Sequence, residues 1–129
     1  MRCWLALTVA VLLPALASAD PVRLAAQSAL QQQRPGTRLL HDGPQLTRLF
    51  GTTLGEGASP EQAAEAFVQA HAPVFGATPA DLVPGSWVDG ALTRPVLYEP
   101  VYDDYKFTLV YYQQQRGGLP VFRGELRLL

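Results

Sequence analysis

The sequence contains one cysteine and two histidines, and these low counts limit the metal and redox chemistry open to it. Cys3 lies among the first 19 residues, so the rest of the chain has no thiol for a disulfide or for a zinc site built on thiolates. Neither histidine belongs to an HExxH motif. We interpret His41 as a solvated turn residue and His71 as a cation near a helix end, with metal ligation as the alternative for each.

Serine and clustered carboxylates are also scarce. Beyond residue 19 the only serines are Ser28, Ser59 and Ser86, and none lies in a GxSxG motif. The acidic group formed by Glu99 and Asp103-Asp104 lacks the spacing of a known calcium loop, so we interpret it as a solvated turn. We therefore predict no catalytic residue, no metal site, no cofactor and no enzymatic activity in the chain itself.

The sequence has no long run of one charge, and its long apolar run lies in the first residues. Without Arg2, nine Lys or Arg face eleven Asp or Glu, a net charge of −2, and no basic run favours nucleic acid. Arg2, the apolar run Trp4–Leu13 and the motif Ala17-Ser18-Ala19 form a signal peptide with cleavage after Ala19. A run of ten residues falls short of the roughly 20 that span a bilayer, so we predict a secreted or periplasmic protein without a membrane anchor after signal removal.

Two segments have the apolar spacing and the start signals of helices. Residues 20–33 begin with Asp20-Pro21 and can form a helix or a frayed arm, so we assign residues 20–44 to an N-terminal arm or helix. Residues 60–72 follow Ser59, which with Gln62 forms a capping box, and they predict the clearest helix of the chain. A single helical turn is expected near residues 78–82.

Alternating residues predict strands elsewhere. We expect a strand at 45–54, one or two extended pieces at 87–98 around the turn pair Asp89-Gly90, and a C-terminal hairpin of 105–115 and 119–129. In its second strand, one face is expected to hold Phe122, Leu126 and Leu128, and the other Arg123, Glu125 and Arg127. These elements predict an α+β fold: a small antiparallel sheet, ending in the hairpin, with a helix covering one face.

Three of these segments carry a family pattern. They are Leu46–Gly51 as a strand, Ser59–His71 with Phe75–Gly76 as a helix and its exit, and Gln114–Phe122 with Leu126 as a hairpin. Together they resemble the FTP domain, the fungalysin/thermolysin propeptide module at the N-terminus of secreted metalloprotease precursors. The hairpin is the most specific part, although Arg116 stands where the family usually has an aromatic residue or histidine.

The resemblance implies that residues 45–129 are a non-catalytic propeptide-like domain, and we expect the domain to be incomplete at its C-terminus. Such a domain inhibits a metallopeptidase and acts as its intramolecular chaperone, with the catalytic domain as partner in cis or in trans. The alternative is a non-peptidase binding or assembly module at the N-terminus of a large secreted protein. An HExxH downstream in the same reading frame would distinguish the two.

The hairpin also supplies the candidate site residues. We predict a partner interface that consists of Tyr111, Tyr112, Gln113, Gln114, Gln115 and Arg116. The residues that shape the hairpin are expected to be Gln114, Gly118, Pro120 and Val121. Gly118 permits the positive φ of a tight turn, and Pro120 at a strand start tolerates the loss of an N–H group.

Overall fold

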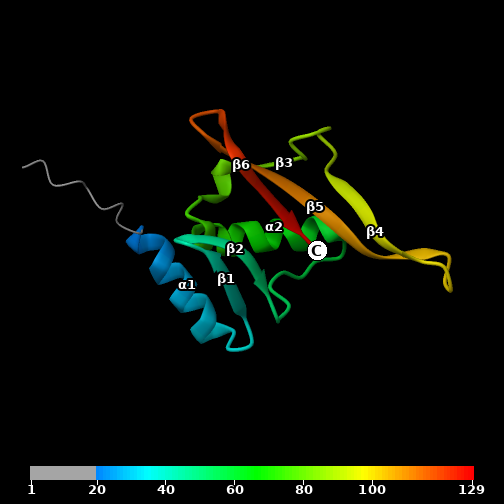
Figure 1. Cartoon of the computed structure of the whole chain (residues 1–129), viewed down its shortest axis with the longest axis horizontal. Coiled ribbons are helices and arrows are strands. Elements are labelled where there is room, and N and C mark those ends of the chain that lie inside the picture. Colours follow the sequence, from blue (N-terminus) through cyan, green and yellow to red (C-terminus); the bar gives the residue numbers. More distant parts are fainter. Residues whose placement is uncertain (1–19) are drawn as a thin grey trace, which may run out of the picture.

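Helix α2 covers one face of a four-stranded antiparallel sheet, and a second, two-stranded sheet lies beside it, so the α+β fold is confirmed (Figure 1). The computed structural model describes residues 20–129; the expected signal peptide and its cleavage site at Ala19 lie outside the described residues. The elements are α1 (Pro21–Gln33), β1 (Arg38–Asp42), β2 (Gln45–Phe50), α2 (Pro60–His71), η1 (Ala72–Phe75), η2 (Pro79–Asp81), β3 (Leu82–Pro84), β4 (Thr93–Glu99), β5 (Asp104–Arg116) and β6 (Leu119–Leu128). Among residues 20–129, no helix combines the length and the apolar character needed to cross a membrane.

The N-terminal segment forms a helix, one of the two alternatives predicted for it. The Asp20 Oδ1 atom accepts a hydrogen bond from the Val22 N–H at 3.0 Å, and Pro21 occupies the first turn. Gln27 and Leu30 are the buried residues of α1. The Gln27 side-chain amide donates to the Val74 carbonyl at 3.0 Å, which ties α1 to η1.

The predicted main helix is confirmed as α2, and its start uses most of the expected cap. The Ser59 Oγ accepts from the Gln62 N–H at 3.3 Å, as a capping box requires. The Gln62 side chain accepts from the N–H of Ala58, one residue earlier than the expected Ser59. The single turn near residues 78–82 is also present as η2, where the Asp81 carboxylate accepts from the N–H of Thr78 at 2.8 Å.

Strand β5 pairs with each of the other three strands of the larger sheet. β3 and β4 follow one another along one edge of β5, while β6 pairs with the C-terminal half of the other edge. Of the one or two extended pieces expected at residues 87–98, one is present as β4; the turn pair Asp89-Gly90 does not join a hairpin, because the strands on either side of it bond to β5 and not to each other. β1 was not predicted at all; in the described part of the chain it pairs only with β2, in the two-stranded sheet.

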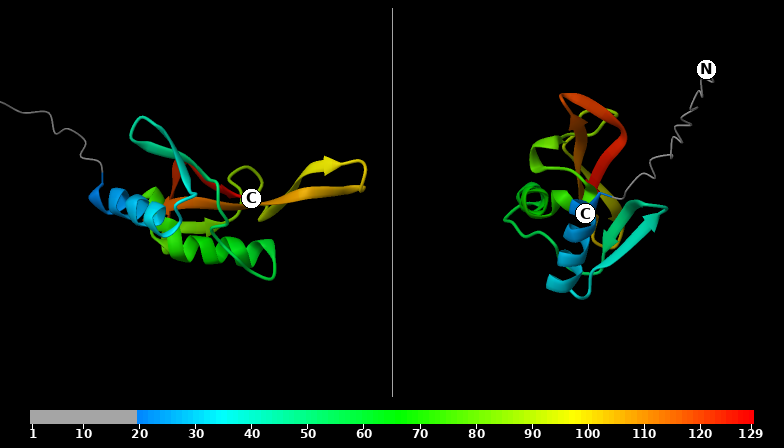
Figure 2. Two further views of the ribbon diagram at one scale, coloured as in Figure 1. Left: turned by 90° about the horizontal axis from the view of Figure 1, so that it is seen from below. Right: turned by 90° about the vertical axis from the view of Figure 1, so that its left-hand side faces the viewer.

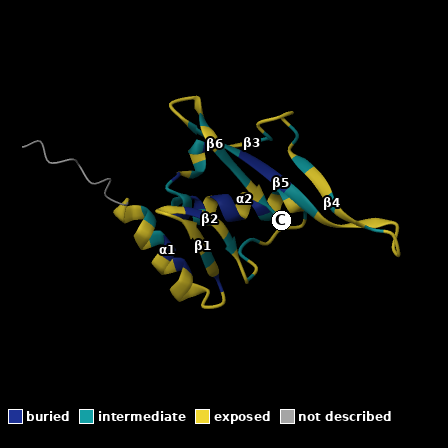
Figure 3. Cartoon of the chain, viewed as in Figure 1, coloured by how far each residue is buried: buried dark blue, intermediate teal, exposed yellow. Residues whose placement is uncertain are grey.

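The core lies between α2 and one face of β5. Ala64, Phe67 and Val68 of α2 pack with Val110 and Tyr112, and all five side chains are buried (Figure 3). Alternate residues of a strand point to opposite faces, so Tyr105, Phe107, Leu109 and Tyr111 lie on the face of the sheet away from α2, which we call the outer face.

The predicted alternation along β6 holds for its second half only. Leu126 and Leu128 pack on the α2 core, but Phe122 is 80% exposed, so its placement with them was wrong. The cause is a bulge: Gln115 pairs with Pro120 and Gln113 with Glu125, leaving four residues of β6 opposite one of β5. Arg123 has a φ of 57° within this bulge, which breaks the alternation.

Candidate binding surfaces

The six predicted interface residues lie together on the C-terminal half of β5, where β3 and β6 flank the strand. This position buries Tyr111 and Tyr112, each 6% exposed. Tyr112 points into the α2 core; burial, followed by the nearby Glu65 carboxylate, raises the pKa of its hydroxyl. Tyr111 lies on the outer face, with the Arg94 guanidinium 5.9 Å from its ring centre. Neither ring is accessible to a partner in this conformation. Their contact with a partner stays a prediction.

The remaining predicted interface residues are more accessible. Gln113, Gln114 and Gln115 are half-buried and Arg116 is exposed. The Arg116 Nη2 donates to the Gly76 carbonyl at 3.0 Å, which ties the hairpin to the end of η1. The Arg116 side chain therefore has a contact within the chain.

The turn of the hairpin has the geometry that its glycines suggest. Gly117 and Gly118 have φ of 57° and 77°, and Pro120 pairs with Gln115 at the start of β6. The role of Gly124 was not predicted from the sequence. A Cβ on Gly124 would lie 2.9 Å from the Val121 Cβ and 3.0 Å from the Gln114 Cβ. Gly124 thus allows the bulge of β6 to approach β5 closely.

A more exposed surface lies at the other end of β5. There β4 and β5 extend away from the rest of the molecule as a two-stranded arm (Figures 1 and 2). Register pairs Tyr98 with Tyr105 and Val96 with Phe107, so these side chains share the outer face with Leu109. We call this set, Val96, Tyr98, Tyr105, Phe107 and Leu109, the aromatic stripe.

The aromatic stripe is ordered by local contacts and yet remains open. Tyr98 and Tyr105 pack edge to face with ring centres 5.3 Å apart, and they are 50% and 49% exposed; Phe107 is 44% exposed. The Tyr98 hydroxyl donates to the Asp103 carboxylate, and this bond, with a smaller contribution from desolvation, raises the pKa of the phenol. Exposed aromatic side chains gathered on one face are typical of protein-binding surfaces.

The acidic residues at the tip of the arm each have a partner of their own. The Glu99 carboxylate lies 2.7 Å from the Lys106 ammonium, and the Asp104 Oδ1 accepts from the N–H of Tyr105 at 2.7 Å. Asp103 accepts from Tyr98, as described above. These contacts describe an exposed turn with local hydrogen bonds, as the sequence predicted.

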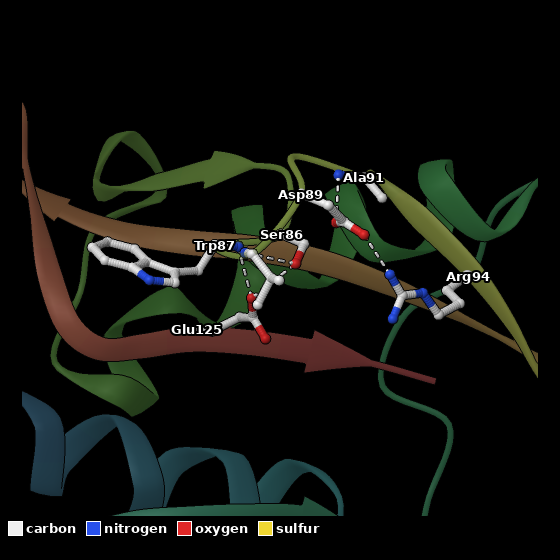
Figure 4. A network of polar contacts seen from close by, with 7 residues as sticks. Ser86, Trp87, Asp89, Ala91, Arg94 and Glu125 are labelled. Carbon is white, nitrogen blue, oxygen red and sulfur yellow. Dashed lines mark hydrogen bonds and ion pairs between the residues drawn. The ribbon is translucent and has the colours of Figure 1, made fainter.

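A polar network holds the loop of residues 86–91 against the outer face (Figure 4). The Glu125 carboxylate of β6 accepts from the N–H of Trp87 at 2.9 Å and from the Nε of Arg127 at 2.8 Å, with the Ser86 hydroxyl at 3.4 Å. Burial by itself raises the pKa of Glu125, but the Trp87 and Arg127 bonds outweigh it and leave that pKa below its ordinary value.

The same loop is closed by a second pair of contacts. The Asp89 carboxylate accepts from the N–H of Ala91 at 3.1 Å and pairs with the Arg94 Nη2 at 2.5 Å (Figure 4). The Ala91 bond is the main reason that the pKa of Asp89 is lowered. Through Arg94, which also lies over Tyr111, this loop connects to the base of the aromatic arm.

The histidines occupy separate places. The His41 Nε2 lies 3.1 Å from the Gln27 Oε1, and the His71 ring packs against Phe67 with centres 5.2 Å apart. Burial lowers the pKa of His71, which favours the neutral ring over the predicted cation. Within residues 20–129, no three His, Cys, Asp or Glu side chains gather in a group that could hold a metal ion.

Comparison with known proteins identified no relative of this chain. No family model, no curated protein and no solved structure matches the chain. The candidate surfaces therefore rest on the sequence and on the geometry described above.

Proposed function

We propose that residues 45–129 are a non-catalytic, propeptide-like module that binds and inhibits a secreted metallopeptidase and assists its folding. The partner is the catalytic domain, in cis or in trans. The observation that carries the proposal is the aromatic stripe, an ordered and open row of side chains on a projecting arm. The resemblance of the hairpin sequence to FTP domains supplies the class of partner.

The stripe has the composition of an interface centre. Tyrosine and phenylalanine bring large contact areas at a small cost in side-chain entropy, and they are enriched in binding interfaces. Burying the exposed halves of Tyr98, Tyr105 and Phe107 against a catalytic domain would stabilise the native form of that domain over its unfolded form, because ligand binding to the native state shifts the equilibrium. Inhibition and folding assistance would then follow from one contact.

An inhibition assay tests the proposal. The full chain, expressed with its own leader so that any processing can occur, is titrated against secreted HExxH metallopeptidases, beginning with thermolysin, and peptide hydrolysis is measured. The informative variant is Tyr105→Ser with Phe107→Ser, and the matched control is Leu119→Ser with Phe122→Ser, which are also strongly exposed but lie on β6. We expect the stripe variant to weaken inhibition at least 30-fold, the equivalent of about 2 kcal/mol, and the control less than threefold.

A refolding assay tests the chaperone role. A denatured catalytic domain is diluted into buffer with the chain, with the stripe variant, or with albumin, and recovered activity is measured after the chain is removed by proteolysis. A higher yield with the chain alone supports the proposal. Two results would oppose it: equal inhibition by the stripe variant and the chain, or no binding to any of these peptidases at high micromolar concentration.

A further inference from the structure

Two strands from different sheets line one groove without bonding to one another. Among residues 20–129, β2 pairs only with β1 and β6 pairs only with β5, so each has one edge without a strand partner there. Both strands line a groove of about 1270 Å³, together with α2 and the segment that follows β2. In the right-hand view of Figure 2, β6 and the β1–β2 hairpin lie on the same side of α2. We call this space the inter-sheet groove.

The free edge of β6 has a definite set of backbone groups. The Tyr111 N–H donates to the Leu92 carbonyl and its own carbonyl accepts from the Gly85 N–H, both at 2.9 Å, so Tyr111 faces the β3–β4 edge. Since neighbouring residues alternate, Val110 and Tyr112 face β6, where they pair with Leu128 and Leu126. The N–H and C=O groups of Glu125 and Arg127 therefore point away from β5, into the inter-sheet groove.

The side chains around the groove are of two kinds. On the α2 side the surface is apolar and comes from both sheets and the helix: Leu46, Leu49, Leu54, Ala64, Phe67, Phe75, Leu126 and Leu128. The charged side chains are those of Arg23, Arg48, Arg123, Arg127 and one acidic residue, Glu125. Arg127 pairs with Glu125, while the other three arginines form no ion pair within the described chain.

We propose that the inter-sheet groove binds an extended, acidic segment of another protein as an added β-strand between β6 and β2. The free N–H and C=O groups of Glu125 and Arg127 would bond its backbone, as in β-strand addition at a sheet edge. The side chains of the bound segment would alternate between two sides. The first set would point to the apolar α2 side of the groove, and the second set would point to the arginines. Positive charge at Arg48 and Arg123 selects acidic residues at the second set of positions. This inference uses a different surface from the aromatic stripe and stands without the proposed function.

Designed peptides provide the test. The first is a capped heptapeptide that alternates glutamate and valine; the second alternates lysine and valine; the third repeats the first with every other backbone amide N-methylated. Binding to the full chain is measured by fluorescence anisotropy of a dye on each peptide. We expect micromolar binding of the first peptide, at least tenfold weaker binding of the other two, and weaker binding of the first as salt is raised.

Variants and hydrogen exchange locate the binding. Arg48→Glu with Arg123→Glu should weaken the first peptide at least tenfold, whereas Arg38→Glu, an exposed arginine of β1 that does not line the groove, should change it less than twofold. Circular dichroism checks that both variants remain folded. At saturation, the amides of Glu125 and Arg127 should exchange at least tenfold more slowly, because an added strand accepts their hydrogen bonds.

Several results would overturn the inference. Equal binding of the glutamate and lysine peptides would remove the charge argument, and equal binding of the N-methylated peptide would remove the strand argument. Slowed exchange confined to another strand edge would place the peptide elsewhere. A dimer in sedimentation that the peptide fails to dissociate would show that a second copy of the chain fills the groove.

Discussion

Removing the Glu125 carboxylate should loosen the loop of residues 86–91 and lower the stability of the whole domain. The Glu125 side chain is only 13% exposed, and its main partner is the Trp87 N–H at 2.9 Å. A hydrogen bond to a charged group contributes about 1.5–3 kcal/mol. The Ser86 contact, at 3.4 Å, is too long to add much.

The exposure of Arg127 and Trp87 determines how much stability the loss of the Glu125 carboxylate should cost. Arg127 is 64% exposed, so its pairing with Glu125 adds no more than about 1 kcal/mol. Trp87 is exposed, so water can replace the lost carboxylate at its N–H, and the lower part of the range applies. For Glu125→Ala we expect the free energy of unfolding to fall by about 2 kcal/mol, and for Glu125→Gln, which keeps an acceptor, by about 1 kcal/mol.

The effect should depend on pH in one direction. The pKa of Glu125 is lower in the folded chain than the ordinary value of 4.5, so the charged carboxylate stabilises the fold. This stabilisation is complete above the unfolded pKa and disappears as the pH falls through the folded pKa. The stability gap between the native chain and Glu125→Gln should therefore be constant near neutral pH and shrink below about pH 4.5.

Urea unfolding measured by circular dichroism gives these free energies. The fluorescence of Trp87, the one tryptophan beyond residue 19, reports on the loop itself. Glu56→Ala, at an exposed glutamate, is the control and should change stability by less than about 0.5 kcal/mol. The reasoning fails if Glu125→Ala behaves like this control, or if the gap to Glu125→Gln persists unchanged in acid.

Three further predictions concern the stability of the fold, and urea unfolding tests each of them. Phe67→Ala should cost about 3–5 kcal/mol because the ring is 6% exposed in the main core, whereas Phe122→Ala, at a ring 80% exposed, should cost less than about 0.5 kcal/mol; equal costs would contradict the burial. Ser59→Ala should cost about 1 kcal/mol through the lost cap of α2, and Ser59→Asn should restore most of it; a cost for both or for neither would argue against the cap. Gly124→Ala should cost about 1–3 kcal/mol, since its Cβ would come within 2.9 Å of the Val121 Cβ, and an unchanged midpoint would mean that the bulge relaxes freely.

The elements that were predicted correctly carry their signals locally. α2 has a cap, an early proline and an apolar stripe within one short segment, so nothing distant is needed to identify it. Similarly, Gly117-Gly118 between two alternating runs determines the C-terminal hairpin. β1 lacks such a signal: four of its five residues are exposed, so only its pairing with β2 identifies it, and that pairing is itself irregular because Thr47 of β2 has no partner in the register.

The binding surfaces were harder to predict because exposure depends on distant strands. Tyr105, Phe107 and Tyr111 follow the same alternation along β5 and share one face. The sequence gives no reason to separate them, yet Tyr111 is buried beneath Arg94 while the other two lie on an arm that nothing covers. The difference is that β3 and β6 flank β5 at Tyr111, whereas only β4 pairs with β5 at Tyr105 and Phe107.

Strand β6 connects the two proposed surfaces through a single residue. The Glu125 side chain points to the outer face and fixes the loop beside the aromatic arm, while its backbone groups face the inter-sheet groove. A strand added at β6 would restrain this residue and so stabilise the Trp87 contact, without touching the loop itself. The dependence must be mutual, because coupling between two sites is reciprocal. Glu125→Ala should therefore weaken binding of an uncharged peptide that alternates serine and valine; the glutamate peptide does not suit this test, because the same change removes a negative charge from the groove lining.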